Sequence, residues 1–296
     1  MDETLDVKVL VTGASGLIGR HVIHALLSKG YTVTAIYQTS LPSFSHPRLT
    51  WLQKDLVIDS LLELNDPYSF THLVHCAAAI PSANLKDQAS YEINKVIDQN
   101  IFAFCKPNEK IRIIYFSSVY IQDYLEKEKE RKLTYFQAKI EGEQEMSHPR
   151  YNGCIMRISS PYGIGQTTRN VLQIFMEKVV KRENITFFGT GARTQDFISA
   201  ADVAGAVLKY LETPTGKCTF NVCSSAPVSM KELAYIVQQA YPATDSKVVQ
   251  SEKPDPQENY RATFDNSDAY EWIKWRPVIS LEEGIKGCVT YLSKIA

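Results

Sequence analysis

The chain has 296 residues, of which 44% are hydrophobic, and its 32 basic and 33 acidic residues leave a net charge of −1 at pH 7. This length suffices for a full core in one large domain or two smaller ones, and the balanced charge carries no signature of binding to nucleic acid or to an anionic membrane. No apolar stretch approaches the roughly 20 residues that span a bilayer, and residues 1–6 are acidic, so we expect a cytoplasmic protein.

Apolar, strand-like runs alternate with helical patterns through the first half of the chain. The strand-like runs are residues 7–11, 31–36, 49–53, 72–76, 111–116 and 153–158. The helical patterns are residues 17–28, 57–64, 90–104 and 133–146. This alternation predicts an α/β fold with a Rossmann-type, doubly wound parallel sheet that binds its ligand at the carboxyl ends of the strands. Beyond residue 158 the pattern loosens, with helical signals at 168–182 and 229–240 and a short strand near 185–188.

A glycine-rich turn joins the first strand-like run to the first helical pattern. Glycine permits a sharp turn and a close approach of the backbone to phosphates, and the free N–H groups at the start of a helix attract an anion. We therefore predict a dinucleotide pyrophosphate site formed by Gly13, Ser15, Gly16, Leu17, Ile18 and Gly19.

The residue after the second strand bears on the choice between NAD and NADP. NAD enzymes place an acidic residue there to bind the ribose hydroxyls, and this chain has Gln38. Without a carboxylate to repel a 2′-phosphate, and with Arg20 as a candidate partner for that phosphate, the pattern favours NADP(H), with NAD(H) as the alternative. Arg20 is equally well interpreted as a solvated helix residue.

Tyr135 and Lys139 lie four residues apart, which places both on one face of a helix. A nearby cation favours phenolate, so we expect the pKa of Tyr135 to lie well below its usual value of about 10. The alternative interpretation is an ordinary surface pair. Ser117 and Ser118 end the strand-like run that precedes this helix.

These motifs, in this order, resemble the extended short-chain dehydrogenase/reductase family of nucleotide-sugar epimerases, dehydratases and reductases, and the resemblance covers nearly the whole chain. The family's Thr-Gly-x-x-Gly-x-x-Gly motif is Thr12–Gly19, and its His-x-Ala-Ala motif is His75–Ala78. Its Ser, Tyr and Lys match Ser118, Tyr135 and Lys139, with Ser117 as the alternative serine. Its Arg-Pro-x-x-x-Tyr-Gly segment and its Gly-x-Gly to Asp-Val segment correspond to residues 157–163 and 189–203.

The resemblance implies how the site works. Tyr135 would exchange a proton with a sugar oxygen, Lys139 would lower the pKa of Tyr135 and hold the nicotinamide ribose, and Ser118 would hydrogen-bond the same sugar oxygen. It also implies cofactor contacts from Asp55, Leu56, Ala77, Ala78, Tyr135 and Lys139.

The resemblance divides the chain into two interleaved domains. We expect residues 1–157 and about 195–223 to form the dinucleotide-binding Rossmann domain. We expect about 158–194 and 224–296 to form a smaller, C-terminal substrate-binding domain. The family commonly dimerises through the helices at 90–104 and 133–146, so a homodimer is expected.

The expected substrate is a nucleotide-diphosphate sugar, contacted by Ser118, Ser160, Arg193 and Gln195. Two departures from the family occur here, because the diphosphate-binding Arg is replaced by Gln195 and a common Asn is replaced by Ser160–Pro161. Arg193, two residues away, is a candidate to bind a phosphate instead.

Several reactions share this set of residues. Dehydratases of the family carry Asp-Glu after the catalytic Ser or Thr, whereas Val119 and Tyr120 follow Ser118, which disfavours dehydration. We predict a 4-keto sugar reductase because Gln38 replaces the acid that favours NAD. An epimerase with retained NAD and a catalytically silent dinucleotide-sensing protein are the alternatives.

The six cysteines and six histidines show no spacing typical of a metal site. A chain of this size needs no disulfide framework, so we expect reduced, structural cysteines and no metal.

Overall fold

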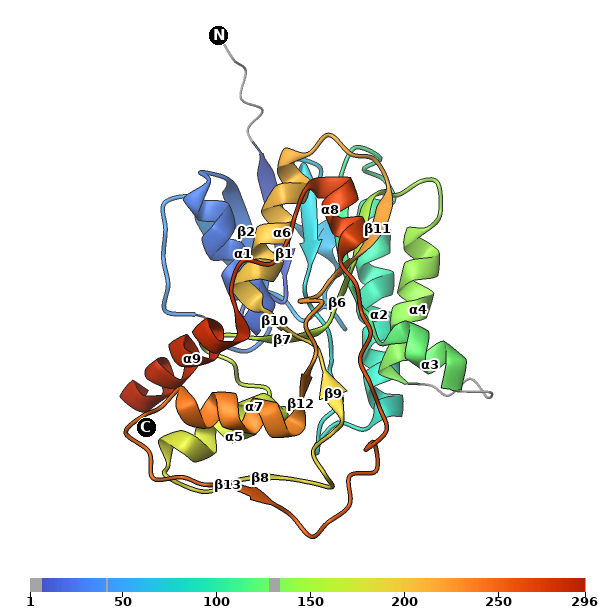
Figure 1. Ribbon diagram of the computed structural model, residues 1–296. Coiled ribbons are helices and arrows are strands. Elements are labelled where there is room, and N and C mark those ends of the chain that lie inside the picture. The colour runs from blue at the N-terminus through green and yellow to red at the C-terminus, as the bar shows by residue number, and fades with distance from the viewer. Residues whose placement is uncertain (1–6, 41, 128–133, 296) are drawn as a thin grey trace. The chain divides into compact units, whose positions relative to one another are not determined.

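The computed structural model describes residues 7–40, 42–127 and 134–295 (Figure 1). Residues 1–6, on which the expectation about location partly depends, lie outside the described residues. The chain forms two compact units, Met1–Ile158 with Ala204–Phe220, and Ser159–Val203 with Asn221–Ala296. The assignment of cofactor binding to the first unit and of substrate binding to the second stays a prediction.

A seven-stranded sheet, in the order β11-β6-β5-β4-β1-β2-β3, contains the strands of the first unit. Its strands are β1 (Lys8–Thr12), β2 (Thr32–Tyr37), β3 (Leu49–Gln53), β4 (His72–His75), β5 (Arg112–Ser118), β6 (Asn152–Ile158) and β11 (Cys218–Val222). Strands β1 to β6 pair in parallel, which confirms the predicted Rossmann-type sheet. The chain order reverses between β1 and β4, and sheets of this kind bind ligands outside the carboxyl ends of such strands.

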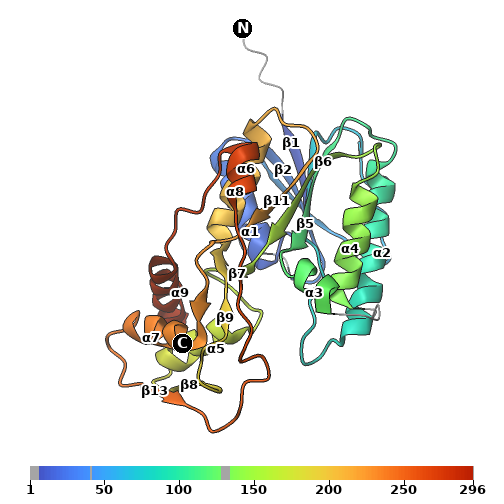
Figure 2. The ribbon, with the colours of Figure 1, turned by 45° about the vertical axis from the view of Figure 1, so that its right-hand side comes forward.

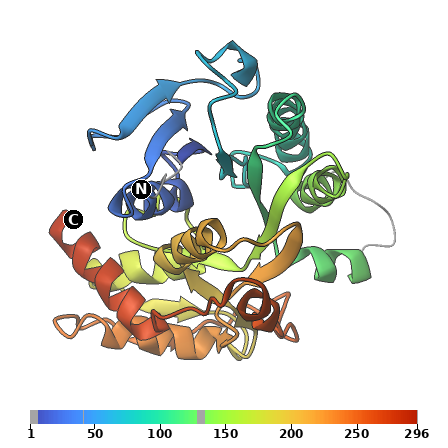
Figure 3. The ribbon, with the colours of Figure 1, turned by 90° about the horizontal axis from the view of Figure 1, so that it is seen from above.

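Helices cover both faces of this sheet. Helices α2 (Asp87–Cys105) and α4 (Tyr135–Met146) pack side by side on one face, and α1 (Leu17–Ser28) lies on the other (Figures 2 and 3). The fully buried Leu10, Leu73 and Ile113, from three adjacent strands, belong to the core under α2. The first unit also contains α3 (Ile121–Lys127), which contacts α4, and most of α6 (Ala200–Glu212).

The helix predicted at 57–64 is wrong, because only a single 3₁₀ turn, η1 (Leu61–Glu63), forms there. The preceding residues form a turn held by two aspartates. Asp59 Oδ2 accepts the N–H of Asp55 at 2.6 Å, and Asp55 Oδ1 accepts the N–H of Val57 at 3.0 Å. These side chains compete with helical hydrogen bonding, as aspartate often does.

The second unit combines short strand pairs with helices. The pairs are β7 (Ser160–Tyr162) with β10 (Phe197–Ser199), β9 (Thr194–Gln195) with β12 (Val228–Ser229), and β8 (Ile185–Phe187) with β13 (Val248–Gln250). The helices are α5 (Val171–Val180), α7 (Met230–Gln239), α8 (Ser267–Ile273) and α9 (Leu281–Ile295). Phe175, Leu233 and Ile285 join α5, α7 and α9 in one apolar core. In the ranges the structure describes, no helix is long and apolar enough to cross a membrane.

Candidate active site

The backbone is too close to admit a side chain at two glycines, one in the turn between β1 and α1 and one in the first turn of α1. Gly13 has φ +61°, and a Cβ there would lie 2.6 Å from the backbone nitrogen of Ala77. A Cβ on Gly19 would lie 2.3 Å from the carbonyl oxygen of Gly13. The N–H of Ala14 donates to the carbonyl of Ile36 at 3.0 Å, which fixes the turn against β2.

The start of α1 fits a dinucleotide pyrophosphate. Gly16 is the N-cap, and no described side chain caps the helix, so the N–H groups of its first turn stay available to an anion. Ser15 is half-buried in the turn, and Leu17 and Ile18 begin the helix. The predicted pyrophosphate residues therefore lie together in this turn and in the first turn of α1.

Gln38 and Arg20 flank this turn. Gln38 follows β2 and is exposed, and its carbonyl accepts a 3.0 Å hydrogen bond from Gln53 Nε2. Arg20 is half-buried in the first turns of α1. The NADP preference that these residues suggested stays a prediction.

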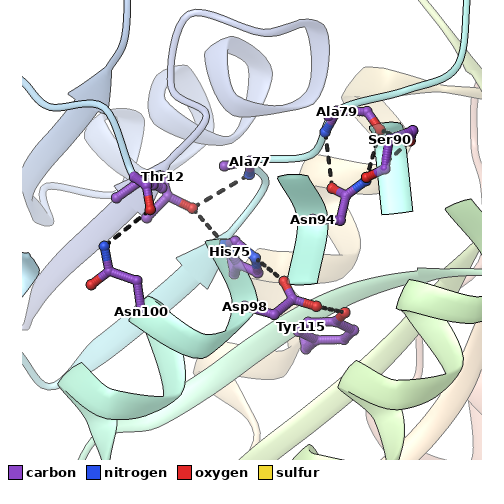
Figure 4. A network of polar contacts seen from close by, with 10 residues as sticks. Thr12, His75, Ala77, Ala79, Ser90, Asn94, Asp98, Asn100 and Tyr115 are labelled. Carbon is purple, nitrogen blue, oxygen red and sulfur yellow. Dashed lines mark hydrogen bonds and ion pairs between the residues drawn. The ribbon is translucent and has the colours of Figure 1, made fainter. Parts of the chain in front are cut away.

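The segment after β4 is held by α2. Asn94 Oδ1 accepts the N–H of Ala79 at 2.9 Å, and Asn94 Nδ2 donates to the carbonyl of Ala79 at 2.8 Å (Figure 4). These bonds fix the chain next to the half-buried Ala77 and Ala78. Of the other residues predicted to contact the cofactor, Leu56 is buried, and Asp55 lies in the turn described above.

Tyr135 and Lys139 lie one turn apart on α4. The helix begins at Tyr135 because the Thr134 side chain accepts the N–H of Gln137 at 3.3 Å. Lys139 is only 2% exposed, and its Nζ lies 5.9 Å from the centre of the Tyr135 ring. A surface pair is thereby excluded.

Both candidate serines are buried at the end of β5. Ser118 Oγ accepts the N–H of Tyr120 at 3.3 Å. Ser117 Oγ is buried without a hydrogen-bond partner among the described residues. Successive residues of a strand point to opposite faces, so the two hydroxyls cannot share one role.

The expected fall in the pKa of Tyr135 is wrong. Burial, reinforced by the negative charge of Asp98, raises the pKa of Tyr135 well above its usual value. Burial lowers the pKa of Lys139. The Lys139 ammonium lies 4.8 Å from the centre of the Tyr115 ring, closer than to the Tyr135 ring, so its charge is shared between two aromatic neighbours.

A buried polar network next to Lys139 went unpredicted. Asp98 accepts hydrogen bonds from Tyr115 at 2.6 Å and from His75 Nε2 at 3.0 Å, and His75 Nδ1 lies 2.8 Å from Thr12 Oγ1 (Figure 4). The sequence signal for it is a pair of polar residues, Asn94 and Asp98, one turn apart within an apolar helical pattern.

The predicted substrate residues lie in the second unit, apart from Ser118. Gln195 Nε2 donates to Ser160 Oγ at 2.6 Å. Arg193 Nε forms an ion pair with Asp255 at 2.8 Å, and its Nη1 donates to Gln257 Oε1 at 3.3 Å. A phosphate at Arg193 would therefore have to share the guanidinium with Asp255.

All six cysteines are free. Within the described ranges, no group of three or more His, Cys, Asp or Glu side chains is arranged to hold a metal ion.

The model of the NAD dependent epimerase/dehydratase family matches residues 9–223. This chain belongs to that family. The predicted membership of the extended short-chain dehydrogenase/reductase group, and the prediction of an NAD(P)-dependent enzyme, are confirmed.

Similar curated proteins differ in activity. The chain is 28% identical to a putative UDP-glucose 4-epimerase of Methanocaldococcus jannaschii, over 96% of this chain and 98% of that protein. It is 27% identical to a dTDP-4-dehydro-6-deoxy-D-allose reductase of a Streptomyces species, over 77% of this chain and 79% of that protein.

The fold is shared with solved epimerases. The UDP-glucose 4-epimerase of Thermotoga maritima, solved with UDP-glucose, has a TM-score of 0.79 at 21% identity, and the match covers 98% of this chain and 99% of that one. The UDP-N-acetylglucosamine 4-epimerase of Methanobrevibacter ruminantium has a TM-score of 0.82 at 21% identity, covering 98% and 99%.

Proposed function

We propose that this protein transfers hydride between a nicotinamide cofactor and a carbon of a nucleotide-diphosphate sugar, as a 4-keto sugar reductase. The observation that carries the proposal is the pair of Tyr135 and Lys139 on α4. Lys139 is buried and Tyr135 is half-buried, and both lie in the same unit as the glycine turn, whose helix has no side-chain cap. The two features supply a proton donor and an anion site, which this reaction requires.

Cofactor binding is assigned to residues of the first unit. Gly13, Gly16 and Gly19 let the N–H groups of α1 approach the pyrophosphate, and Lys139 holds the nicotinamide ribose. Asp55, Leu56, Ala77 and Ala78 contact the rest of the cofactor. The bound cofactor supplies the hydride.

Tyr135 donates the proton. Because burial raises the pKa of Tyr135, its phenol is protonated at neutral pH, which is the form that gives a proton to a carbonyl oxygen during reduction. The Ser118 hydroxyl donates a hydrogen bond to the same oxygen and stabilises the charge that develops there.

The reductase assignment depends on Gln38. Its exposed, uncharged side chain after β2 leaves room for a 2′-phosphate, and Arg20 on α1 lies in the same unit. A reductase consumes a dissociable cofactor, and NADPH suits that role.

A second candidate is a 4-epimerase that retains NAD. The similarity to the putative epimerase of M. jannaschii over nearly the full length of both proteins favours it. For both candidates we assign Ser160, Gln195 and Arg193 to substrate binding. A phosphate of the substrate would then share the Arg193 guanidinium with Asp255.

We also propose a homodimer formed through α2 and α4. The groove between these helices is lined by Phe102 and Tyr151, aromatic residues of a kind enriched at interfaces, with Lys106 and Glu145 as charged groups suited to an interface rim. Light scattering after gel filtration tests this, and a monomer at micromolar concentration would contradict it.

The test of function is to denature the purified protein, identify any released dinucleotide by mass spectrometry, and titrate the emptied protein with NADH and NADPH. A site that is empty as purified and prefers NADPH supports the reductase. Stoichiometric retained NAD supports the epimerase. Binding of neither dinucleotide would contradict both.

A further inference from the structure

Lys139 is a buried ammonium whose charge needs a partner. The residue is 2% exposed. Its Nζ lies 4.8 Å from the centre of the Tyr115 ring and 5.9 Å from the centre of the Tyr135 ring. Aromatic faces attract a cation only modestly, whereas transfer of a charge from water to the interior is costly. A stable, charged Lys139 therefore requires a nearby negative charge.

Asp98 is a buried carboxylate on the neighbouring helix α2. It is 6% exposed, and Oδ2 accepts the Tyr115 hydroxyl at 2.6 Å. Tyr115 donates its hydroxyl to Asp98 (Figure 4). The same ring faces the Lys139 ammonium, so one side chain touches both charges.

A chain of hydrogen bonds connects Asp98 to the glycine turn. The carboxylate can only accept, so His75 Nε2 carries the proton of the 3.0 Å bond to Asp98 Oδ1. Burial lowers the pKa of His75, so the ring is neutral and its Nδ1 accepts the Thr12 hydroxyl at 2.8 Å. Thr12 Oγ1 in turn accepts the N–H of Ala77 at 3.4 Å.

We propose that Asp98 is a positioning residue that keeps Lys139 charged and, through His75 and Thr12, ties Lys139 to the turn that would bind the dinucleotide. Asp98 touches neither substrate nor cofactor in this proposal. The role of Lys139 in ribose binding rests on the proposed function, whereas the coupling between the two charges does not.

The other titratable groups around Lys139 are either paired with another residue or uncharged at pH 7. Glu143, on α4, forms a two-point pair with Arg157 at 2.6 and 2.9 Å. Burial raises the pKa of the Cys76 thiol, and it raises the pKa values of Tyr115 and Tyr135, so these groups are neutral at pH 7. His75 is neutral as well.

The directions of the two pKa shifts agree with this pairing. Burial lowers the pKa of Lys139, and Asp98 is the strongest of the groups that oppose this. Burial tends to raise the pKa of Asp98, but Lys139, His75 and Tyr115 together bring it below its usual value. Each of the two charges therefore favours the charged form of the other residue.

The direct test is an NMR titration of the ¹⁵Nζ resonance of Lys139 in Asp98→Asn and in Glu143→Gln. Glu143→Gln is the matched control, because it removes the other carboxylate near Lys139. We expect Asp98→Asn to lower the pKa of Lys139 by about 1 to 3 pH units, and Glu143→Gln to lower it far less. Equal shifts, or no shift in Asp98→Asn, would overturn the proposal.

A reciprocal variant covers the case in which Asp98→Asn does not fold. Lys139→Met keeps a buried aliphatic stem and removes the charge, and the ¹³Cγ resonance of Asp98 is then titrated. Coupling between two sites is reciprocal, so the pKa of Asp98 should rise by as much as that of Lys139 fell. An unchanged Asp98 titration would contradict the pairing.

Dinucleotide binding separates this inference from the proposed function. If both hold, the wild type binds a nicotinamide dinucleotide, and Asp98→Asn loses binding at a lower pH than the wild type, because Lys139 loses its proton at a lower pH. If the wild type binds no dinucleotide, the proposed function fails while the NMR result still stands. Binding that falls equally at every pH in Asp98→Asn would indicate a merely structural role and overturn the positioning role.

Discussion

The Lys139 ammonium lies 5.9 Å from the centre of the Tyr135 ring, one turn along α4, yet the pKa of Tyr135 is raised. Burial is the larger cause of this rise, and the negative charge of Asp98 adds to it. The phenol therefore keeps its proton at neutral pH and is suited to protonate a sugar carbonyl.

Tyr135→Phe should lower kcat/KM about 10²- to 10⁴-fold, because the proton donor is lost. Affinity for the dinucleotide should change far less, since Lys139, the glycine turn and the aromatic ring at position 135 remain. Steady-state kinetics and fluorescence titration measure the two effects. Tyr291→Phe, at a partly exposed position of α9, is the control and should behave like the wild type. Normal turnover in Tyr135→Phe would remove this residue from the mechanism.

The two directions of the reaction should depend differently on pH. A phenol with a raised pKa stays protonated through neutral pH, so ketone reduction should be constant between about pH 6 and 8. Alcohol oxidation needs the phenolate and should speed up as the pH rises. Initial rates in both directions across this range check the prediction. A reduction rate that falls steeply around pH 7 would show a lowered pKa instead.

Gly19→Ala should abolish dinucleotide binding and reduce the free energy of unfolding by about 1 to 3 kcal/mol, because the new methyl overlaps the Gly13 carbonyl. Gly287→Ala, also within a helix but with nothing within 4 Å of the added Cβ, is the control and should stabilise the protein by about 0.5 to 1 kcal/mol. Denaturant unfolding and dinucleotide titration compare the two. The account of the turn fails if both variants behave alike.

Gln38→Asp should weaken NADPH binding about tenfold or more, which corresponds to about 1.4 kcal/mol, while NADH binding is kept or improved. The new carboxylate would repel a 2′-phosphate and accept hydrogen bonds from ribose hydroxyls. Ser40→Asp adds the same charge two residues further on and should shift the preference less. An unchanged ratio of NADH to NADPH affinity in Gln38→Asp would separate this position from cofactor choice.

Local patterns predicted the elements that local chemistry determines. The patterns at 17–28 and 49–53 coincide with α1 and β3. Each of these elements is determined by residues close together in the chain, the glycine turn for α1 and the apolar alternation for β3. Helix α9 was missed, although the apolar residues Ile285 and Val289, one turn apart, are typical of a helix. Both are buried in the structure. Helix α8 has seven residues, and Asp268 near its start accepts the N–H of the distant Asn221, which no local pattern contains.

In the candidate site too, local patterns predicted some features, and contacts between distant residues determined the others. The glycines, Tyr135 and Lys139 were predicted from their spacing together with the resemblance to the family. The pKa of Tyr135 was not, because it depends on the distant Asp98. Likewise the Arg193–Asp255 pair joins residues 62 positions apart in the chain. Burial and charges brought together by folding decide both properties.

The central claim is tested most directly by measuring the transfer of an isotope label from the dinucleotide to a sugar. Wild-type protein is incubated with NADPH or NADH carrying deuterium at nicotinamide C4 and with a set of 4-keto nucleotide-diphosphate sugars, and the products are analysed by mass spectrometry. The proposed reductase should place one deuterium on the sugar ring and release the oxidised dinucleotide. Tight binding of the dinucleotide with no deuterium in any sugar of the set would contradict hydride transfer to this class of substrate.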